Sequence, residues 1–229
     1  LDFNGVKKEL EKFTKNTIEK FLSQGVGIDY VQIGNEINNG FMYPFGQIDW
    51  RDDNTKRTTM DNLATLLNTA INAIKTTSPN TKFIIHVGDY ALKTWHDDST
   101  GKDVPLALWF FQQLDYRRVN YEIAAASYYL YYHHIDGDYL DMNKMTDSIN
   151  QFIDAFGKPF MIMEYSTAFT LNYHQYADNQ FKEEYANLIG REYPTSFQGQ
   201  TNMILDIAER VARAKNNKGL GICYWGGDW

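Results

Sequence analysis

The stretch "VQIGNEINNG" at residues 31–40 decides the fold. Its apolar beginning predicts a short buried strand, and this strand leads directly into the polar pair Asn35 and Glu36. A second apolar run, "PFMIMEY" at residues 159–165, also ends beside a carboxylate, that of Glu164. Two buried strands that each end in a glutamate are typical of a sheet whose strand ends carry a reactive site.

Apolar runs of this kind alternate with helical patterns along the chain. Strands are predicted at residues 29–36, 82–88, 121–129, 159–165 and 219–227. Helices are predicted at residues 5–24, 57–77, 103–118, 141–156 and 199–215. The strands are continuous apolar runs, as in parallel strands that are buried on both faces. Five such repeats, without a linker rich in proline, glycine or serine, predict a single α/β domain over residues 1–229.

Two architectures fit this alternation, namely an open doubly wound sheet and a (β/α)8 TIM barrel. Open sheets that bind nucleotides usually carry a glycine-rich turn after the first strand, and this chain has none. Instead, a polar or aromatic residue of the kind used in active sites stands at the end of each predicted strand. These residues are Asn35, Glu36, His86, Tyr128, Tyr129, Glu164 and Trp225. A TIM barrel builds its active site at that face, so the pattern favours the barrel.

Composition excludes several classes of function. The formal net charge is −7 and the chain has no basic tract, which argues against a nucleic-acid partner. No apolar run approaches the roughly 18 residues that a membrane span requires. A single cysteine, Cys223, excludes both a disulfide framework and a cysteine-rich metal site. Aromatic residues make up 15% of the chain, which suits a surface that stacks on sugar rings, although most rings are expected to fill the core.

A pair of carboxylates at one barrel mouth indicates glycoside hydrolysis. One acid protonates the departing oxygen, while the other attacks or stabilises the anomeric carbon. If the carboxyl groups of Glu36 and Glu164 lie roughly 5–5.5 Å apart, the reaction retains configuration through a covalent glycosyl-enzyme. The alternative for either glutamate alone is an ordinary ion-pair partner at a strand end.

Five segments extend this interpretation to a resemblance. They are "VQIGNEINNGFMYPFG", "SYYLYYHH", "KPFMIMEYS", "YPTSFQGQ" and "CYWGGDW". Together they resemble glycoside hydrolase family 53, the endo-β-1,4-galactanases. The resemblance runs over nearly the whole chain. It implies a retaining (β/α)8 hydrolase that cleaves β-1,4-galactan, the side chain of pectic arabinogalactan type I.

The resemblance also implies roles for individual residues. Glu36 matches the general acid/base and Glu164 the nucleophile. Asn35 matches the amide that binds the 2-hydroxyl of the reacting sugar. His86 matches the fifth-strand histidine, with a satisfied core histidine as its alternative.

Three further residues complete the matched positions. Tyr128 matches the sixth-strand tyrosine near the nucleophile, although both Tyr128 and Tyr129 are also compatible with simple packing. His133 matches a loop histidine of the family. Trp225 matches the eighth-strand tryptophan that floors the sugar site.

The chain departs from the family pattern in the substrate groove. Tyr43 stands where the family usually has tryptophan, which makes a stacking platform smaller. Leu130 and Tyr132 replace proline and tryptophan, and Gly226–Gly227 replaces a Glu-Pro pair. A hydrolase of the same clan that acts on another β-linked glycan, such as mannan or glucan, therefore stays open as an alternative.

The five predicted strands correspond to about strands 4 to 8 of the barrel. The first three strands and the last helix have no counterpart, so we expect a domain that is incomplete at both ends. Its expected partners are a polysaccharide and the N-terminal part of the same barrel. An inactive carbohydrate-binding fragment is a further alternative.

Two expectations concern cofactors and location. Some members of the family hold calcium, but this chain has no Asp-x-Asp-x-Asp-Gly pattern, so we expect no cofactor. Polymeric substrates are too large to import whole, which predicts a secreted protein.

Overall fold

The computed structural model describes residues 1–98, 101–135, 141–172 and 183–226. The chain forms two compact units. Unit 1 comprises residues 1–88 and 107–124, and unit 2 comprises residues 89–106 and 125–229. The single domain predicted over residues 1–229 stays a prediction.

Five strands follow one another through the sheet in chain order, β1-β2-β5-β6-β7. Their bounds are Tyr30–Gln32 for β1, Lys82–Val87 for β2, Ile123–Ser127 for β5, Phe160–Tyr165 for β6 and Gly219–Tyr224 for β7. β1 pairs in parallel with β2, and β6 pairs in parallel with β7. All five overlap the predicted strands, so the predicted alternation of strands and helices is confirmed.

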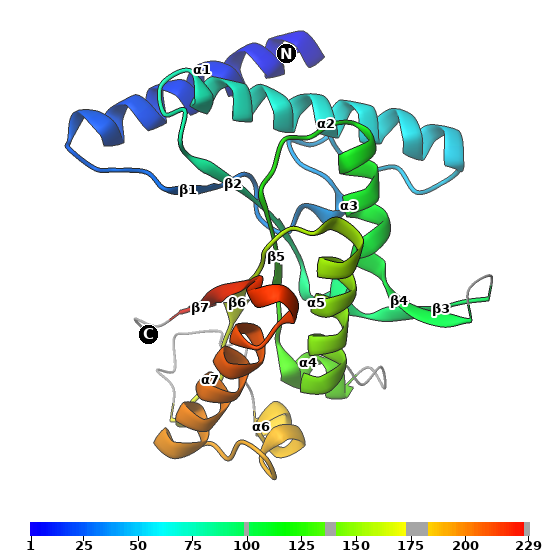
Figure 1. The fold of residues 1–229 in the computed structure, drawn as a ribbon, viewed down its shortest axis with the longest axis vertical. Coiled ribbons are helices and arrows are strands. Elements are labelled where there is room, and N and C mark those ends of the chain that lie inside the picture. Colours follow the sequence, from blue (N-terminus) through cyan, green and yellow to red (C-terminus); the bar gives the residue numbers. More distant parts are fainter. Residues whose placement is uncertain (99–100, 136–140, 173–182, 227–229) are drawn as a thin grey trace. The chain divides into compact units, whose positions relative to one another are not determined.

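In unit 1, two long helices lie side by side, α1 at Phe3–Ser23 and α2 at Asp53–Lys75 (Figure 1). Each begins where an aspartate caps it. The side chain of Asp2 accepts a hydrogen bond from the Gly5 amide, and Asp52 accepts from two amides in the first turn of α2. α2 buries one apolar stripe that includes Leu63, Leu66, Leu67 and Ile71. Helix α3, Leu106–Tyr116, belongs to this unit except for its first residue.

Unit 2 carries the remaining helices and a small hairpin. The helices are α4 at Leu130–Ile135, α5 at Met142–Phe156, α6 at Glu183–Ile189 and α7 at Phe197–Ala212. Strands β3 at Thr94–Asp97 and β4 at Lys102–Pro105 pair as an antiparallel hairpin. Short 3-10 turns lie at Ile37–Asn39 (η1, in unit 1), Asp89–Leu92 (η2) and Lys215–Asn217 (η3). None of the helices in the described ranges combines the length and the apolar character that a bilayer span requires.

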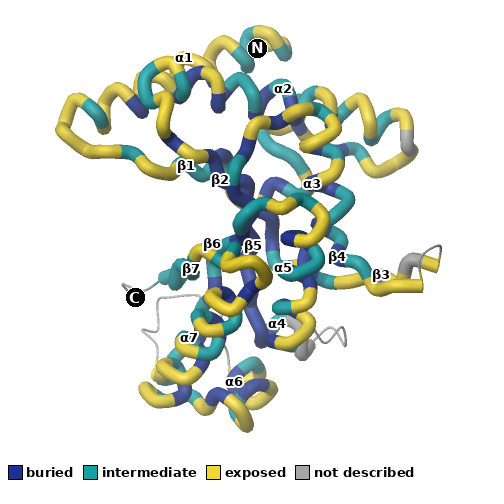
Figure 2. Tube along the Cα trace, viewed as in Figure 1, coloured by how far each residue is buried: buried dark blue, intermediate teal, exposed yellow. Residues whose placement is uncertain are grey.

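The inner strands carry the most buried residues. All five residues of β5 are buried, and so are five of the six residues of β2 (Figure 2). β7 is only half-buried along most of its length. Small side chains in β5, from Ala124 to Ala126, leave no surface exposed. Burial on both faces explains why these strands appear in the sequence as continuous apolar runs.

Several elements differ from the sequence prediction. The helix predicted from residue 103 begins at Leu106, because residues 102–105 pair with β3 and Pro105 ends that strand. The hairpin itself was not predicted. Nor were α4 and α6, which are six and seven residues long and too short to show a helical period.

Candidate active site

The turn after β1 presents Asn35 and Glu36 to solvent. Glu36 adopts φ 49° and ψ 49°, in the left-handed region that side chains other than glycine seldom occupy. Gly34 has φ +74°, and a Cβ there would lie 2.5 Å from Cγ2 of Ile37. Since Ile37 is almost fully buried, the turn is held by packing beneath it. This backbone strain at a glutamate is a feature that often marks a functional position.

Asn35 is oriented by two donors. Its Oδ1 accepts a hydrogen bond from Nε2 of Gln32 at 3.1 Å and faces Nδ1 of His86 at 3.0 Å. Gln32 Nε2 also donates to the carbonyl oxygen of Gly34 at 2.8 Å. With its oxygen directed at both donors, the Nδ2 group of Asn35 is the part of the amide that can donate to a ligand.

His86 lies on β2 and is fully buried. Burial lowers the pKa of His86 from 6.5 to about 4, because the imidazolium loses its hydration. The ring is therefore neutral near pH 7, with one nitrogen carrying a proton. Since Nδ1 faces the oxygen of Asn35, we assign the proton to Nδ1 and an acceptor role to Nε2.

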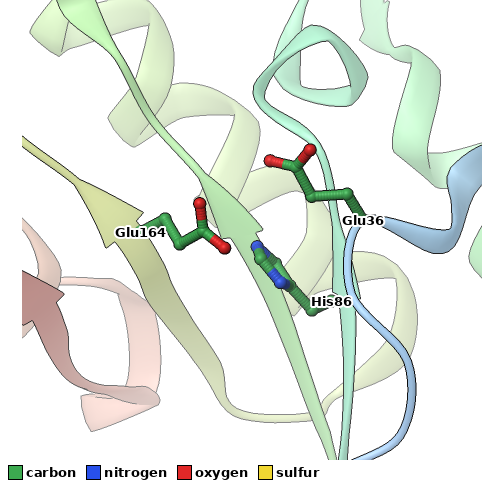
Figure 3. A group of neighbouring side chains, drawn as sticks. All are labelled: Glu36, His86 and Glu164. Atoms are coloured by element: carbon green, nitrogen blue, oxygen red, sulfur yellow. The ribbon is translucent and has the colours of Figure 1, made fainter. Parts of the chain in front are cut away.

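Glu36 and His86 lie near each other in unit 1, with a carboxylate oxygen and a ring nitrogen within 4.8 Å. Figure 3 shows Glu36 in the turn after β1, His86 on β2 and Glu164 on β6.

A side chain at position 88 would contact the carboxyl group of Glu36, a proximity that the sequence did not predict. A Cβ at position 88 would lie 3.5 Å from Cδ of Glu36 and 3.3 Å from Oδ1 of Asn38. The Gly88 amide donates a hydrogen bond to the same Asn38 oxygen at 2.8 Å. Gly88 and Asn38 therefore form a wall beside Glu36. In the sequence, the one feature that could have indicated this proximity is the glycine that directly follows the residues of β2.

In unit 2, Glu164 lies on β6 and is half-buried. The phenol of Tyr129 donates a hydrogen bond to Oε2 of Glu164 at 2.8 Å. The sequence predicted Tyr128 as a tyrosine near Glu164 and did not predict this hydrogen bond from Tyr129. Tyr128 follows β5, and its amide donates to the backbone oxygen of Glu164 at 2.8 Å. A direct role for Tyr128 in substrate binding stays a prediction.

Unit 2 is rich in tyrosine rings, some of which contact Tyr129. The ring of Tyr129 lies 5.8 Å from that of Tyr131 and 5.7 Å from that of Tyr132, centroid to centroid. Burial raises the pKa of Tyr131, and burial raises the pKa of Tyr165 to about 12. These two phenols are therefore protonated at any pH where the protein would work.

The other predicted site residues lie on separate segments of the chain. Trp225 directly follows β7 and is half-buried, and its amide donates to the Tyr165 carbonyl at 2.9 Å. Tyr43 is 57% exposed, and its phenol donates to the Asn39 carbonyl at 3.1 Å. His133 falls within α4, but its side chain lies outside the described part of the structure.

Comparisons of the sequence with family models and with known proteins point to the same family. The family model described as "Glycosyl hydrolase family 53" matches residues 1–229. An endo-β-1,4-galactanase of Bacillus subtilis is 28% identical over 229 residues, which is 100% of this chain and 46% of that protein. An arabinogalactan endo-β-1,4-galactanase of Humicola insolens is 24% identical over 100% of this chain and 60% of its own length.

A solved structure agrees with these relatives. The Ignisphaera aggregans GH53 catalytic domain superposes with a TM-score of 0.81 at 26% identity, over 100% of this chain and 56% of that domain. This chain therefore spans about half the length of the relatives it matches. The predicted fold class, a partial (β/α)8 barrel, is confirmed.

Proposed function

Because this chain belongs to glycosyl hydrolase family 53, we propose that the protein is a retaining endo-β-1,4-galactanase. Its substrate would be the β-1,4-galactan of arabinogalactan type I. The names of the Bacillus subtilis and Humicola insolens relatives support this substrate. In this proposal, Glu36 is the acid/base and Glu164 the nucleophile.

The observation that carries the proposal is the placement of the two glutamates. Glu36 follows the first strand of a sheet and Glu164 lies near the end of the fourth strand in the same order. Carboxyl ends of barrel strands are where enzymes of this fold hold their reactive groups. Each glutamate also has a defined environment, with Gly88 beside Glu36 and the Tyr129 phenol on Glu164.

The proposed reaction proceeds in two steps. Glu164 attacks the anomeric carbon while Glu36 donates its proton to the departing oxygen, which gives a covalent galactosyl-enzyme. Glu36 then acts as a base and removes a proton from water, which hydrolyses this intermediate with net retention. The hydrogen bond from Tyr129 would hold the Glu164 carboxylate in the rotamer that attacks.

The remaining residues would bind the sugar. The Asn35 amide, whose oxygen is directed at Gln32 and His86, would donate from Nδ2 to the 2-hydroxyl. The side chain of Trp225 would form the floor of the sugar-binding site. Tyr43, whose ring is exposed, would supply a small stacking surface.

Tyr128 and His133 are proposed as further substrate contacts. The proposal also includes a polysaccharide as partner, the rest of the barrel in the same protein, and secretion.

The deciding experiment is reducing-sugar release by the full natural protein from β-1,4-galactan, with β-mannan and β-glucan as comparison substrates. Galactan should be the preferred substrate, and the product anomer, followed by NMR, should match that of the substrate. Release from mannan or glucan alone would overturn the galactanase assignment. An inverted product would overturn the retaining mechanism.

Two variants test the roles. Glu36→Ala should lose roughly 10²–10⁴-fold in activity and recover part of it with azide, which attacks the intermediate without a base. Glu164→Ala should form no covalent intermediate. Wild-type kcat in either variant would end its assignment.

A further inference from the structure

Phe169 and Phe197 form a stacked pair on the surface of unit 2. Their ring centroids lie 4.4 Å apart and the ring planes differ by only 12°. Phe169 is 40% exposed and Phe197 is 72% exposed. Phe197 is the first residue of α7, and Phe169 lies in the segment after β6. Two parallel rings thus present apolar faces to solvent at one place.

This arrangement is unusual for phenylalanine. Large apolar side chains are among the residues most often buried, and single exposed ones need no explanation. A joined pair is different, because contiguous exposed apolar surface commonly marks a binding site. Most of the Phe197 side chain remains exposed although one ring face already contacts Phe169.

The segment that carries Phe169 is firmly held. Nε2 of Gln200 donates to the Thr167 carbonyl at 2.9 Å and to the phenol oxygen of Tyr224 at 3.0 Å. The Thr167 amide donates to the same phenol oxygen at 3.3 Å. Thr167 itself is buried. A side-chain network from α7 and β7 therefore fixes the backbone two residues before Phe169, and the ring is presented from a supported position.

The pair also lies close in the chain to the proposed nucleophile. Phe169 follows Glu164 by five residues, so an extended backbone places their Cα atoms at most about 18 Å apart. Glu164, Thr167, Phe169 and Phe197 all belong to unit 2. A polymer held at the proposed nucleophile could therefore extend over the pair within this unit.

Exposed amides lie on the same helix as Phe197. Gln198 and Asn202 lie on the first turns of α7, and Nε2 of Gln198 donates to Oδ1 of Asn202 at 2.7 Å. Amide side chains both donate and accept hydrogen bonds, which matches the hydroxyl groups of a sugar. Exposed apolar rings and neutral amides at the start of α7 suit a sugar better than an ion.

We propose that Phe169 and Phe197 form an aromatic platform that binds a sugar unit of the β-1,4-galactan chain away from the cleaved bond. This inference rests on the proposed function and adds a specificity determinant to it. One face of a galactose ring exposes C–H groups, which pack on an aromatic surface, while its hydroxyls reach Gln198 and Asn202. The platform contacts a sugar unit of the galactan that does not react. It therefore contributes the same binding free energy to the bound substrate and to the transition state.

A structural role predicts different behaviour. If the pair only fastened the segment after β6 to α7, its loss would lower the melting temperature and leave polymer binding unchanged. A binding role predicts the reverse. Replacing Phe197 by tryptophan keeps a flat ring at the exposed position, so Phe197→Trp should bind the polymer as the wild type does.

The experiment compares Phe169→Ala, Phe197→Ala and Phe197→Trp in the full natural protein. The matched control is Phe13→Ala, because Phe13 is 70% exposed on α1 in unit 1. KM for polymeric galactan should rise about 3- to 10-fold in each phenylalanine-to-alanine variant of the pair, with kcat unchanged, as expected when one aromatic contact is lost. The control and Phe197→Trp should match the wild type, and melting temperatures should stay within a few degrees.

Electrophoresis in gels that contain galactan measures binding of the polymer by the slowed migration of the protein, independently of hydrolysis. It therefore tests the platform separately from the proposed catalytic function. A wild-type protein that hydrolyses galactan, with KM and retardation unchanged in both alanine variants, overturns the platform alone. Wild-type retardation without hydrolysis, lost in the alanine variants, supports the platform and overturns the catalytic proposal. A wild type that neither binds nor hydrolyses galactan overturns both.

Discussion

The Tyr129 phenol donates a hydrogen bond to Oε2 of Glu164 at 2.8 Å. A neutral donor on a carboxylate stabilises its ionised form and fixes its rotation. Both are properties that a nucleophile needs, so Tyr129→Phe should slow the reaction even though only one oxygen atom is lost. A hydrogen bond to a charged group contributes about 1.5–3 kcal/mol, so kcat/KM on galactan should fall roughly 10- to 100-fold.

The control for Tyr129→Phe is Tyr116→Phe, because Tyr116 is 82% exposed on α3 in the other unit. That variant should keep wild-type kinetics. Both variants should melt cooperatively, since the ring of Tyr129 remains in place. Unchanged kcat/KM in Tyr129→Phe would show that the hydrogen bond does not contribute to the reaction.

Buried His86 should make stability depend on pH. Folding lowers the pKa of His86 from 6.5 to about 4, so between these values the unfolded chain binds more protons than the folded chain. The stabilisation is complete above about pH 6.5 and is lost as the pH falls toward 4. Linkage gives a loss of about 3 kcal/mol across this window. Urea unfolding at several pH values measures it.

The matched comparison is His86→Gln against His96→Gln, because His96 is exposed on β3. Removing the titrating ring at position 86 should flatten the pH dependence between pH 4 and 6.5 relative to wild type. His96→Gln removes an exposed histidine and controls for the substitution itself. Equal slopes for wild type and His86→Gln would mean that the Glu36 carboxylate offsets the cost of burying the charged ring.

The buried strands could be predicted because their sequence pattern is local. Residues 82–88 and 159–165 were predicted as strands, and the structure has them at Lys82–Val87 and Phe160–Tyr165. Apolar runs between polar boundaries suffice for this. β1 is shorter than predicted, since it ends at Gln32 and the positive φ of Gly34 follows. The sequence shows a glycine there but not the conformation it adopts.

The site was predictable only in part. Glu36 and Glu164 stand out because each ends an apolar run. The hydrogen bond from Tyr129 to Glu164 was not predicted, since adjacent tyrosines after a strand point to different sides and the sequence pattern does not show which one faces the carboxylate. The proximity of Gly88 to Glu36 involves residues that are far apart in the chain. Only the folded unit brings them together.

That proximity leads to a prediction for Gly88→Ala. The new Cβ would lie 3.3 Å from Oδ1 of Asn38 and 3.5 Å from Cδ of Glu36. Asn38 must then shift by a few tenths of an ångström. Because Asn38 and position 88 lie beside the Glu36 carboxyl group, we expect Glu36 to shift as well. Since a displacement of about 1 Å at a reacting group can cost 10²-fold, we expect kcat/KM to fall about 3- to 10-fold.

The control for Gly88→Ala is Gly27→Ala, because no atom lies within 4 Å of a Cβ at position 27. Both variants should unfold within about 1 kcal/mol of wild type, as is usual away from serious clashes. A loss of activity that is equal in the two variants would contradict a local effect on Glu36.

Alanine substitutions at Gly34, in the turn before Glu36, and at Gly25, after α1, separate two energetic costs of adding a side chain. One is the cost of a left-handed backbone conformation, and the other is the cost of a steric clash. Both have positive φ, +74° and +78°, but only at Gly34 would a Cβ meet another atom, Cγ2 of Ile37 at 2.5 Å. Gly25→Ala should therefore lose only the cost of a left-handed alanine, about 1–2 kcal/mol. Gly34→Ala should lose a further 1–3 kcal/mol or so from overpacking, because Ile37 is buried and cannot move freely.

Urea unfolding of the two alanine variants measures the difference, and kinetics on galactan add a second readout. Gly34 lies two residues before Glu36, so Gly34→Ala should also reduce kcat/KM, whereas Gly25→Ala should not. Adding Ile37→Leu, which removes the clashing Cγ2 methyl and keeps the side-chain volume, should recover part of the stability lost in Gly34→Ala. If the two alanine variants are equally destabilised, the clash with Ile37 is relieved by small backbone shifts, and the turn is not held by packing on that residue.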